Sequence, residues 1–114
     1  MTTVMEPRTF PFGSRTRTSV LVALCLLEES FPRELARLLE TSLHTVQRAL
    51  EGLELAGLVS GRTAGRTRLY RLEPRYFAHR ELLPYLRRLA EADPELEARV
   101  ATLRRRPRRA GKPL

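Results

Sequence analysis

A short polar and basic segment, "TSLHTVQR" at positions 41–48, contains side chains suited to hydrogen bonds with base edges and phosphates. Gln47 has the amide that pairs with adenine, and Arg48 has the guanidinium fork that pairs with guanine. His44 lies beside them in the chain, and three hydroxyls that suit backbone phosphate come from Thr41, Ser42 and Thr45. This chemistry requires one element that turns these groups to the same side. Plain solvated polar side chains are the alternative interpretation.

A helix that begins after Ser42 meets that requirement, because Ser is a preferred N-cap residue. Its apolar positions recur at the spacing of one helical face, and they are Val46, Leu50 and Leu53. With Val46 facing inward and about 100° per residue, His44 lies about 160° away, Arg48 about 200° and Gln47 about 100°. The N-terminal residues of a helix in the major groove are those that reach base edges. We therefore predict that this helix start contacts DNA.

Three more arginines follow in a glycine-containing segment. Leu58–Val59 and Thr67–Leu72 have strand character, and Gly61–Gly65 between them is predicted to form the turn of a hairpin. The arginines on or beside this turn are Arg62, Arg66 and Arg68. We predict that they contact the DNA backbone or the neighbouring minor groove.

The charge distribution favours a polyanionic partner. Residues 1–59 carry six arginines and seven acidic residues, a net charge of −1, whereas residues 60–114 carry 15 basic and six acidic residues, a net charge of +9. Such asymmetry points to nucleic acid, and less often to an anionic membrane. Twenty of the 21 basic residues are arginine, whose fork suits phosphates and guanine edges. A coding bias toward arginine is the alternative explanation of that composition.

The elements of the N-terminal half are predicted from caps and periodicity. Residues 1–12 are expected to form a loose arm, followed by a helix over Arg15–Glu29 with Ser14 as its cap. The apolar positions of this helix wrap much of its circumference, so it is either central or shared with a second subunit. A second helix is expected over Arg33–Leu39, with Leu35, Ala36 and Leu39 buried.

The C-terminal half contains two start signals with proline. Arg75–Leu82 is expected to form a short helical turn, and Pro84 to begin a helix that reaches about Ala92. Asp93–Pro94 repeats the signal for a final helix. The apolar stripe of that helix, either core packing or a dimer seam, is Leu96, Val100 and Leu103.

Two stretches resemble a known family. "ELARLLETSLHTVQRALEGLELAGLV", Glu34–Val59, is similar to the helix-turn-helix of ArsR-like and MarR-like bacterial regulators, and "GRTAGRTRLYRL" is similar to their wing. The resemblance covers about Gly13–Leu72 and rests on the order and spacing of the motifs. It implies a mainly α fold with a small β-hairpin, a winged helix-turn-helix with additional C-terminal helices. It also implies a cytoplasmic, DNA-binding transcriptional regulator that acts on double-stranded DNA as a homodimer.

The sequence predicts four parts along the chain. An arm at 1–12 precedes a DNA-binding domain at 13–92, and a C-terminal helix at 93–106, a candidate for dimerisation, precedes a basic disordered tail at 107–114. 

Four residues depart from the pattern of these regulators. Relatives usually have glycine at the position of Glu40 and an apolar residue at the position of Thr41. Leu43 and Leu55 are apolar on a helix that would face DNA. These leucines favour an alternative function, a winged-helix protein-interaction module or an antitoxin-like partner of a nucleotidyltransferase-type protein.

Other classes of function find little support in the residues. We expect no enzyme, because no paired carboxylates, nucleophile–base set or phosphate-cradling loop can be recognised. We expect no cofactor and no metal, since the single cysteine, Cys25, lies in an apolar run and only two histidines are present. A small buried hydrophobe is the preferred reading of Cys25 over a redox switch. No membrane association is expected either, because the apolar run Val20–Leu27 is far too short to span a bilayer.

Overall fold

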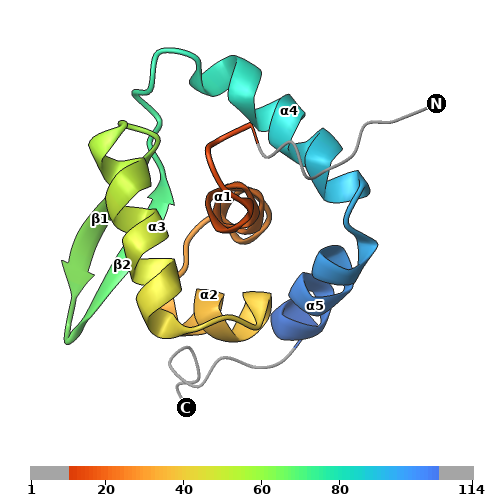
Figure 1. The fold of residues 1–114 in the computed structure, drawn as a ribbon, viewed down its shortest axis with the longest axis horizontal. Coiled ribbons are helices and arrows are strands. Elements are labelled where there is room, and N and C mark those ends of the chain that lie inside the picture. The colour runs from red at the N-terminus through yellow and green to blue at the C-terminus, as the bar shows by residue number, and fades with distance from the viewer. Residues whose placement is uncertain (1–10, 106–114) are drawn as a thin grey trace.

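The computed structural model describes residues 11–105, which form a mainly α fold with one β-hairpin, as predicted (Figure 1). The elements in chain order are α1 (Arg15–Leu27), α2 (Pro32–Leu39), α3 (Leu43–Leu55), β1 (Val59–Ala64), β2 (Thr67–Leu72), α4 (His79–Glu91) and α5 (Pro94–Arg105). A tight turn joins α2 to α3, and the hairpin follows at once. This order is a winged helix-turn-helix with two additional C-terminal helices. Residues 1–10 of the predicted arm at 1–12, and the whole predicted tail at 107–114, lie outside the described residues.

Helix α1 occupies the centre of the molecule, with the other elements arranged around it (Figure 1). Ser14 caps it as predicted, since its hydroxyl oxygen accepts a hydrogen bond from the Arg17 N–H at 3.1 Å. Val20–Leu24 are all buried. Of the two predicted alternatives, a central helix and a helix shared with a second subunit, the structure supports the central helix. The helix ends at Leu27, earlier than the predicted Glu29, because the chain turns back there. Ser30 then pairs with Tyr70 of β2 in an antiparallel bridge.

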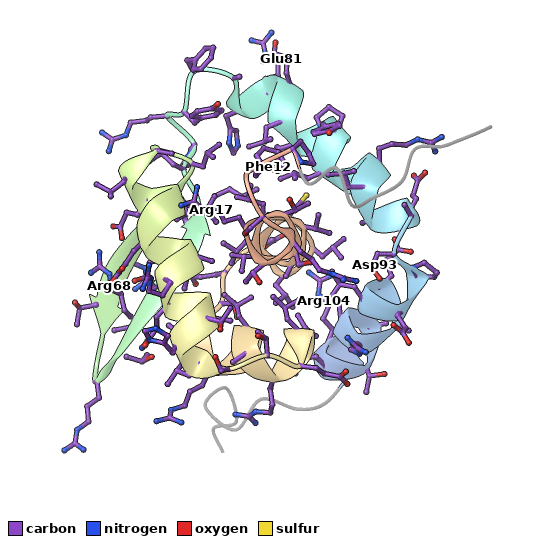
Figure 2. The ribbon with its side chains drawn as sticks, in the orientation of Figure 1. Phe12, Arg17, Arg68, Glu81, Asp93 and Arg104 are labelled. Atoms are coloured by element: carbon purple, nitrogen blue, oxygen red, sulfur yellow. The ribbon has the colours of Figure 1, made fainter. Side chains whose placement is uncertain are left out.

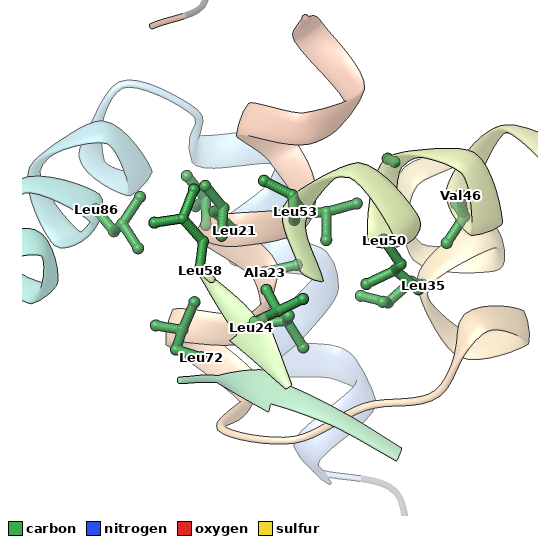
Figure 3. Close-up of a cluster of buried hydrophobic side chains, with 14 of the residues drawn as sticks. Leu21, Ala23, Leu24, Leu35, Val46, Leu50, Leu53, Leu58, Leu72 and Leu86 are labelled. Atoms are coloured by element: carbon green, nitrogen blue, oxygen red, sulfur yellow. The ribbon is translucent and has the colours of Figure 1, made fainter. Parts of the chain in front are cut away.

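Helices α2 and α3 close one side of the core around α1 (Figure 3). The predicted stripe on α3 is confirmed, because its three members, Val46, Leu50 and Leu53, are all buried. Gly57 has a φ of 80° and ends α3 as expected. On α2 the prediction was partly wrong: Leu35 is buried, but Leu38 is the second buried residue, and Ala36 and Leu39 are only half-buried.

The hairpin is longer than the sequence predicted. Strand β1 begins at Val59 and runs to Ala64, and the antiparallel register pairs Val59 with Leu72 and Ala64 with Thr67. The turn therefore consists of Gly65 and Arg66, with Gly65 at a φ of 66°, and the predicted turn over Gly61–Gly65 was wrong. Gly61 lies inside the strand instead, since a glycine is accepted there when neighbouring side chains cross the backbone closely.

The two C-terminal helices complete the core. Pro84 lies inside α4, not at the start of a helix as predicted, and the predicted separate turn over Arg75–Leu82 overlaps the first residues of α4. An interior proline removes one backbone hydrogen bond. We attribute the continued helix to the burial of Leu82, Leu86 and Ala90 on one side of it.

Helix α5 begins as predicted, because an Asp93 carboxylate oxygen accepts a hydrogen bond from the Leu96 N–H at 3.2 Å. Leu96 and Val100 are buried against the rest of this chain, so they belong to its core and not to a dimer seam. Leu103 is only half-buried. Within residues 11–105, no helix is long and apolar enough to cross a membrane.

Candidate nucleic-acid interface

The first turn of α3 has a complete N-cap. Ser42 has an extended backbone, and its hydroxyl oxygen accepts a hydrogen bond from the Thr45 N–H at 3.0 Å. The hydroxyls of Ser42 and Thr45 also bond to each other at 2.8 Å. Leu43 and His44 donate no N–H within the helix, because the first turn offers no acceptor. These two N–H groups and the positive end of the helix dipole form a site that suits a phosphate.

Replacing Ser42 with alanine is expected to lower the free energy of unfolding by about 1 kcal/mol, since the cap hydrogen bond is lost. Urea unfolding followed by circular dichroism measures this change. Ser19, a half-buried serine inside α1 with no side-chain hydrogen bond among the described ones, provides the matched control, and its alanine variant should change stability by less than about 0.5 kcal/mol. Equal effects of the two substitutions would contradict the role of Ser42 as a cap.

The outward face of α3 presents the side chains that were predicted for base contacts. Val46 is fully buried, and His44, Gln47 and Arg48 are exposed, as the helical geometry requires. Thr41 and Thr45 are half-buried, and Ser42 is exposed. All six residues are thus gathered at one end of one helix.

The sequence reading missed one residue on this face. Glu51 is exposed and follows Arg48 by three positions, so it lies one helical turn further along. Among the described ion pairs none joins Arg48 to Glu51. The negative charge of Glu51 therefore marks where the basic first part of α3 ends. In the sequence, only the helical spacing of three residues from Arg48 indicates that Glu51 lies on this face.

The hairpin places its three arginines in three different settings. Residues alternate between the two faces of a β-ribbon, and the register puts Arg62 opposite Leu69 and Arg68 opposite Thr63. Arg62 and Arg68 therefore point to opposite faces. Arg66 lies in the turn itself, is exposed, and makes no ion pair within the part of the chain that the structure describes.

Arg68 lies on the face of the hairpin that meets α3 (Figure 2). Its guanidinium donates a hydrogen bond to Glu54 of α3 at 3.0 Å and lies 5.5 Å from the centre of the Tyr70 ring. The hydrogen bond to Glu54 raises the pKa of Arg68, and a further bond to Tyr70 acts in the same direction. A Cβ at Gly61 would lie 2.7 Å from Nε of Arg68, so this glycine makes room for the arginine.

Arg62 is tied to the other face. Its guanidinium donates to the Glu29 carboxylate at 3.1 Å, beyond the end of α1. An open depression of about 430 Å³ lies there, with Arg71, Glu73 and Arg75 on its rim. Arg62 and Arg68 thus lie on opposite faces of the hairpin. The sequence analysis did not predict this difference between the two arginines.

The start of α3 and the hairpin turn lie toward the same end of the molecule. In Figure 1 both are at the lower left, and the hairpin runs alongside α3. The Arg68–Glu54 ion pair joins the two elements directly. A single extended partner can therefore reach the first turn of α3 and the hairpin turn together.

One further reactive group among residues 11–105 is the thiol of Cys25. Cys25 is half-buried, and burial raises the pKa of its thiol, although the charge of Arg87 opposes this. A raised pKa reduces the thiolate fraction, which agrees with a structural cysteine. No group of three or more metal-binding side chains occurs among residues 11–105.

Comparison with known proteins supports the fold. No protein-family model matches the sequence, and no curated protein matches it. A mutant of Lactococcus lactis ZitR superposes with a TM-score of 0.59 at 19% identity, over 89% of this chain and 64% of that chain. The MarR family transcription regulator SP03579 superposes with a TM-score of 0.58 at 22% identity, over 76% of this chain and 58% of that one.

A third structure contains DNA. Another mutant of Lactococcus lactis ZitR, in complex with DNA, has a TM-score of 0.50 and 22% identity, over 79% of this chain and 70% of that chain. This chain spans less than two thirds of the length of the first relative, of which it covers 64%. At these identities the likeness shows the fold: the chain is a winged helix-turn-helix like those of transcriptional regulators, as the sequence resemblance predicted.

Proposed function

We propose that this winged helix-turn-helix is a DNA-binding transcriptional regulator. The start of α3 enters the major groove, and the hairpin turn lies on the adjacent backbone or minor groove. The observation that carries the proposal is the exposed row of His44, Gln47 and Arg48 at a capped helix start, with Arg66 at the nearby hairpin turn. A solved neighbour of this fold in complex with DNA supports it.

Each side chain at the helix start has a distinct role in this proposal. Gln47 pairs with adenine and Arg48 with guanine, and His44 contacts the edge of a neighbouring base. The hydroxyls of Ser42 and Thr45 share one hydrogen bond, so one hydroxyl proton stays available for a phosphate, whichever of the two donates. Thr41 contacts the same strand of the backbone.

The three hairpin arginines contribute unequally. Arg66 makes the principal backbone contact, because it lies in the turn and pairs with no acidic side chain among residues 11–105. Arg68 exchanges Glu54 for a phosphate, a trade between two anionic acceptors at an exposed position. Arg62 acts mainly through its charge, since it points to the face away from α3.

Replacing Arg66 with alanine is expected to weaken binding to every duplex by about threefold to tenfold and to reduce the salt slope by about one. Fluorescence anisotropy over a series of salt concentrations measures both quantities. Arg80, an exposed arginine on α4, provides the control for the loss of one positive charge. Arg66→Ala binding that equals Arg80→Ala binding, with the same salt slope, would rule out the contact at the hairpin turn.

We also propose that the chain acts as a homodimer with two recognition helices about one DNA turn apart, which requires a pseudo-palindromic site. Because α1 is enclosed within the chain, the interface must come from outer faces such as that of α4. Tyr85 is 43% exposed on this helix and packs against Phe12 at 6.1 Å between ring centres. Sedimentation equilibrium of the wild type and of Tyr85→Arg tests this: a wild type that stays monomeric refutes the dimer.

A protein-interaction module is the second candidate, and two side chains favour it. Leu55 and Phe77 are each 90% exposed, whereas Leu43 proves to be half-buried. An antitoxin-like role would use these exposed apolar side chains to contact a nucleotidyltransferase-type partner. Co-purification with the neighbouring gene product, with and without Leu55→Ser and Phe77→Ser, distinguishes the two functions, because neither variant should affect binding to DNA.

A further inference from the structure

The turn between α2 and α3 contains an unusual residue for its conformation. Glu40 has φ 55° and ψ 47°, the left-handed region that disfavours a side chain. Two hydrogen bonds of a helix-ending motif close the turn there, from Glu40 N–H to the Arg37 carbonyl at 3.3 Å and from Thr41 N–H to the Ala36 carbonyl at 3.0 Å. The carbonyl of Leu38 takes part in neither bond.

Arg99 of α5 supplies what this turn lacks. One guanidinium nitrogen donates to the Leu38 carbonyl at 3.2 Å, and the other lies 3.3 Å from a Glu40 carboxylate oxygen. Glu95, one turn earlier on α5, lies 3.8 Å from the same nitrogen. The Arg99 side chain is 33% exposed, so it is partly shielded from water, whereas Glu40 is 69% exposed. A single guanidinium fork thus holds both the backbone and the side chain of the turn.

We propose that Arg99 is a positioning residue for DNA binding, which holds the α2–α3 turn and neutralises Glu40 beside the DNA-contacting start of α3. This inference rests on the proposed function. Glu40 is only two positions before the Ser42 cap, so its negative charge is carried by the turn that leads directly into the helix start where a phosphate would bind. Without Arg99 the negative charge of Glu40 would repel that phosphate, and the left-handed turn would lose its only contact from α5 among the described hydrogen bonds and ion pairs.

The geometry also explains how a glutamate is accepted where glycine would be less strained. A backbone carbonyl at the end of α2 carries the negative end of the helix dipole, which favours a cation such as Arg99. The same cation attracts the Glu40 side chain toward α5 and away from α3. Helix α5 is therefore connected to the start of α3, the proposed DNA-contacting helix, through the α2–α3 turn.

The test is a double-substitution cycle with Arg99→Gln, Glu40→Gln and the two combined. Arg88→Gln serves as the matched control, since Arg88 is an exposed arginine on α4 that pairs with Glu91. Binding to one duplex is measured by anisotropy at low salt, and thermal unfolding is measured without DNA. Arg99→Gln is expected to weaken binding by about fivefold beyond the control. Adding Glu40→Gln should restore most of that loss.

The outcomes separate charge neutralisation from helix capping. Loss of the Leu38 hydrogen bond alone would not be repaired by Glu40→Gln, so equal binding of the single and the double variant overturns the proposal. Unchanged binding of Arg99→Gln overturns it as well. A wild type that binds no duplex refutes the proposed function and with it the DNA role of Arg99. Thermal unfolding then shows separately whether Arg99 holds the turn, through a melting temperature lowered by about 4 °C, and by less in the Glu40→Gln background.

Discussion

Replacing Arg48 with alanine is expected to remove most of the sequence preference of this protein. Binding to a preferred duplex should weaken by about tenfold to a hundredfold, since a bidentate contact to a guanine edge contributes about 1–3 kcal/mol of discrimination. Binding to a scrambled duplex should change by less than about threefold, because the lost side chain contacts a base edge and the contacts with phosphates remain. The exposed position of Arg48 next to the capped helix start is the reason for this difference.

The measurement begins with selection of preferred duplexes from a randomised pool by the wild-type protein. Anisotropy titrations then compare the wild type, Arg48→Ala and the control Arg80→Ala on selected and scrambled duplexes. The Arg80→Ala substitution removes the same charge from α4, which lies on the other side of α1 from the hairpin (Figure 1). If Arg48→Ala and Arg80→Ala lose affinity equally on both duplexes, Arg48 does not read a base.

Replacing Leu21 with alanine is expected to lower the free energy of unfolding by about 2–5 kcal/mol. Leu21 is 0% exposed on the central helix and lies in the apolar cluster drawn in Figure 3. Because α1 is enclosed on its sides by other elements, the cavity cannot be filled by a simple shift of one neighbour. A domain of this size has a total stability of about 5–15 kcal/mol, so the loss is a large part of it.

Chemical unfolding monitored by circular dichroism gives this value. Leu55→Ala is the matched control, since Leu55 is 90% exposed and its truncation should change stability by less than about 0.5 kcal/mol. Similar losses in the two variants would mean that Leu21 is not in the centre of the core, or that Leu55 is covered in solution. Sedimentation of Leu55→Ala against the wild type would then distinguish these cases.

The parts of the fold that local signals determine could be predicted from the sequence. Ser14, Ser42 and Asp93 each begin a helix as expected, because a side-chain oxygen there bonds a backbone N–H one turn ahead. The buried stripe of α3 could also be predicted, since apolar residues spaced three to four positions apart lie on a single face of a helix. Gly57 ended that helix for a local reason too, its left-handed backbone.

Features that depend on distant contacts could not be predicted. The position of Pro84 predicts a helix start, but α4 continues through Pro84 because the helix packs on the core. Gly61 reads as a turn residue, but it lies in β1 because Arg68 and Tyr70 cross it, with the Tyr70 ring 2.9 Å from where a Cβ would be. The bridge from Ser30 to Tyr70 also has no local signal, since it joins segments 40 residues apart.

The candidate site divides in the same way. The outward direction of Gln47 and Arg48 follows from helical geometry and is seen in the structure, although their contacts with bases remain a prediction. The opposite directions of Arg62 and Arg68 depend on the register of the hairpin, which the misplaced turn concealed. Arg99 had no sequence signal at all, because its partner turn is 59 positions away and only the tertiary fold brings the two together.

The most direct measurement of DNA contact is a titration of the isotope-labelled 13.1 kDa chain with a short duplex, followed by amide NMR. Shifts should concentrate at residues 41–48 and at the hairpin turn around Arg66, while the amides of α4 stay nearly unchanged. Perturbations confined to α4 and α5, with none at the start of α3, would contradict the assignment of this surface as the one that meets DNA.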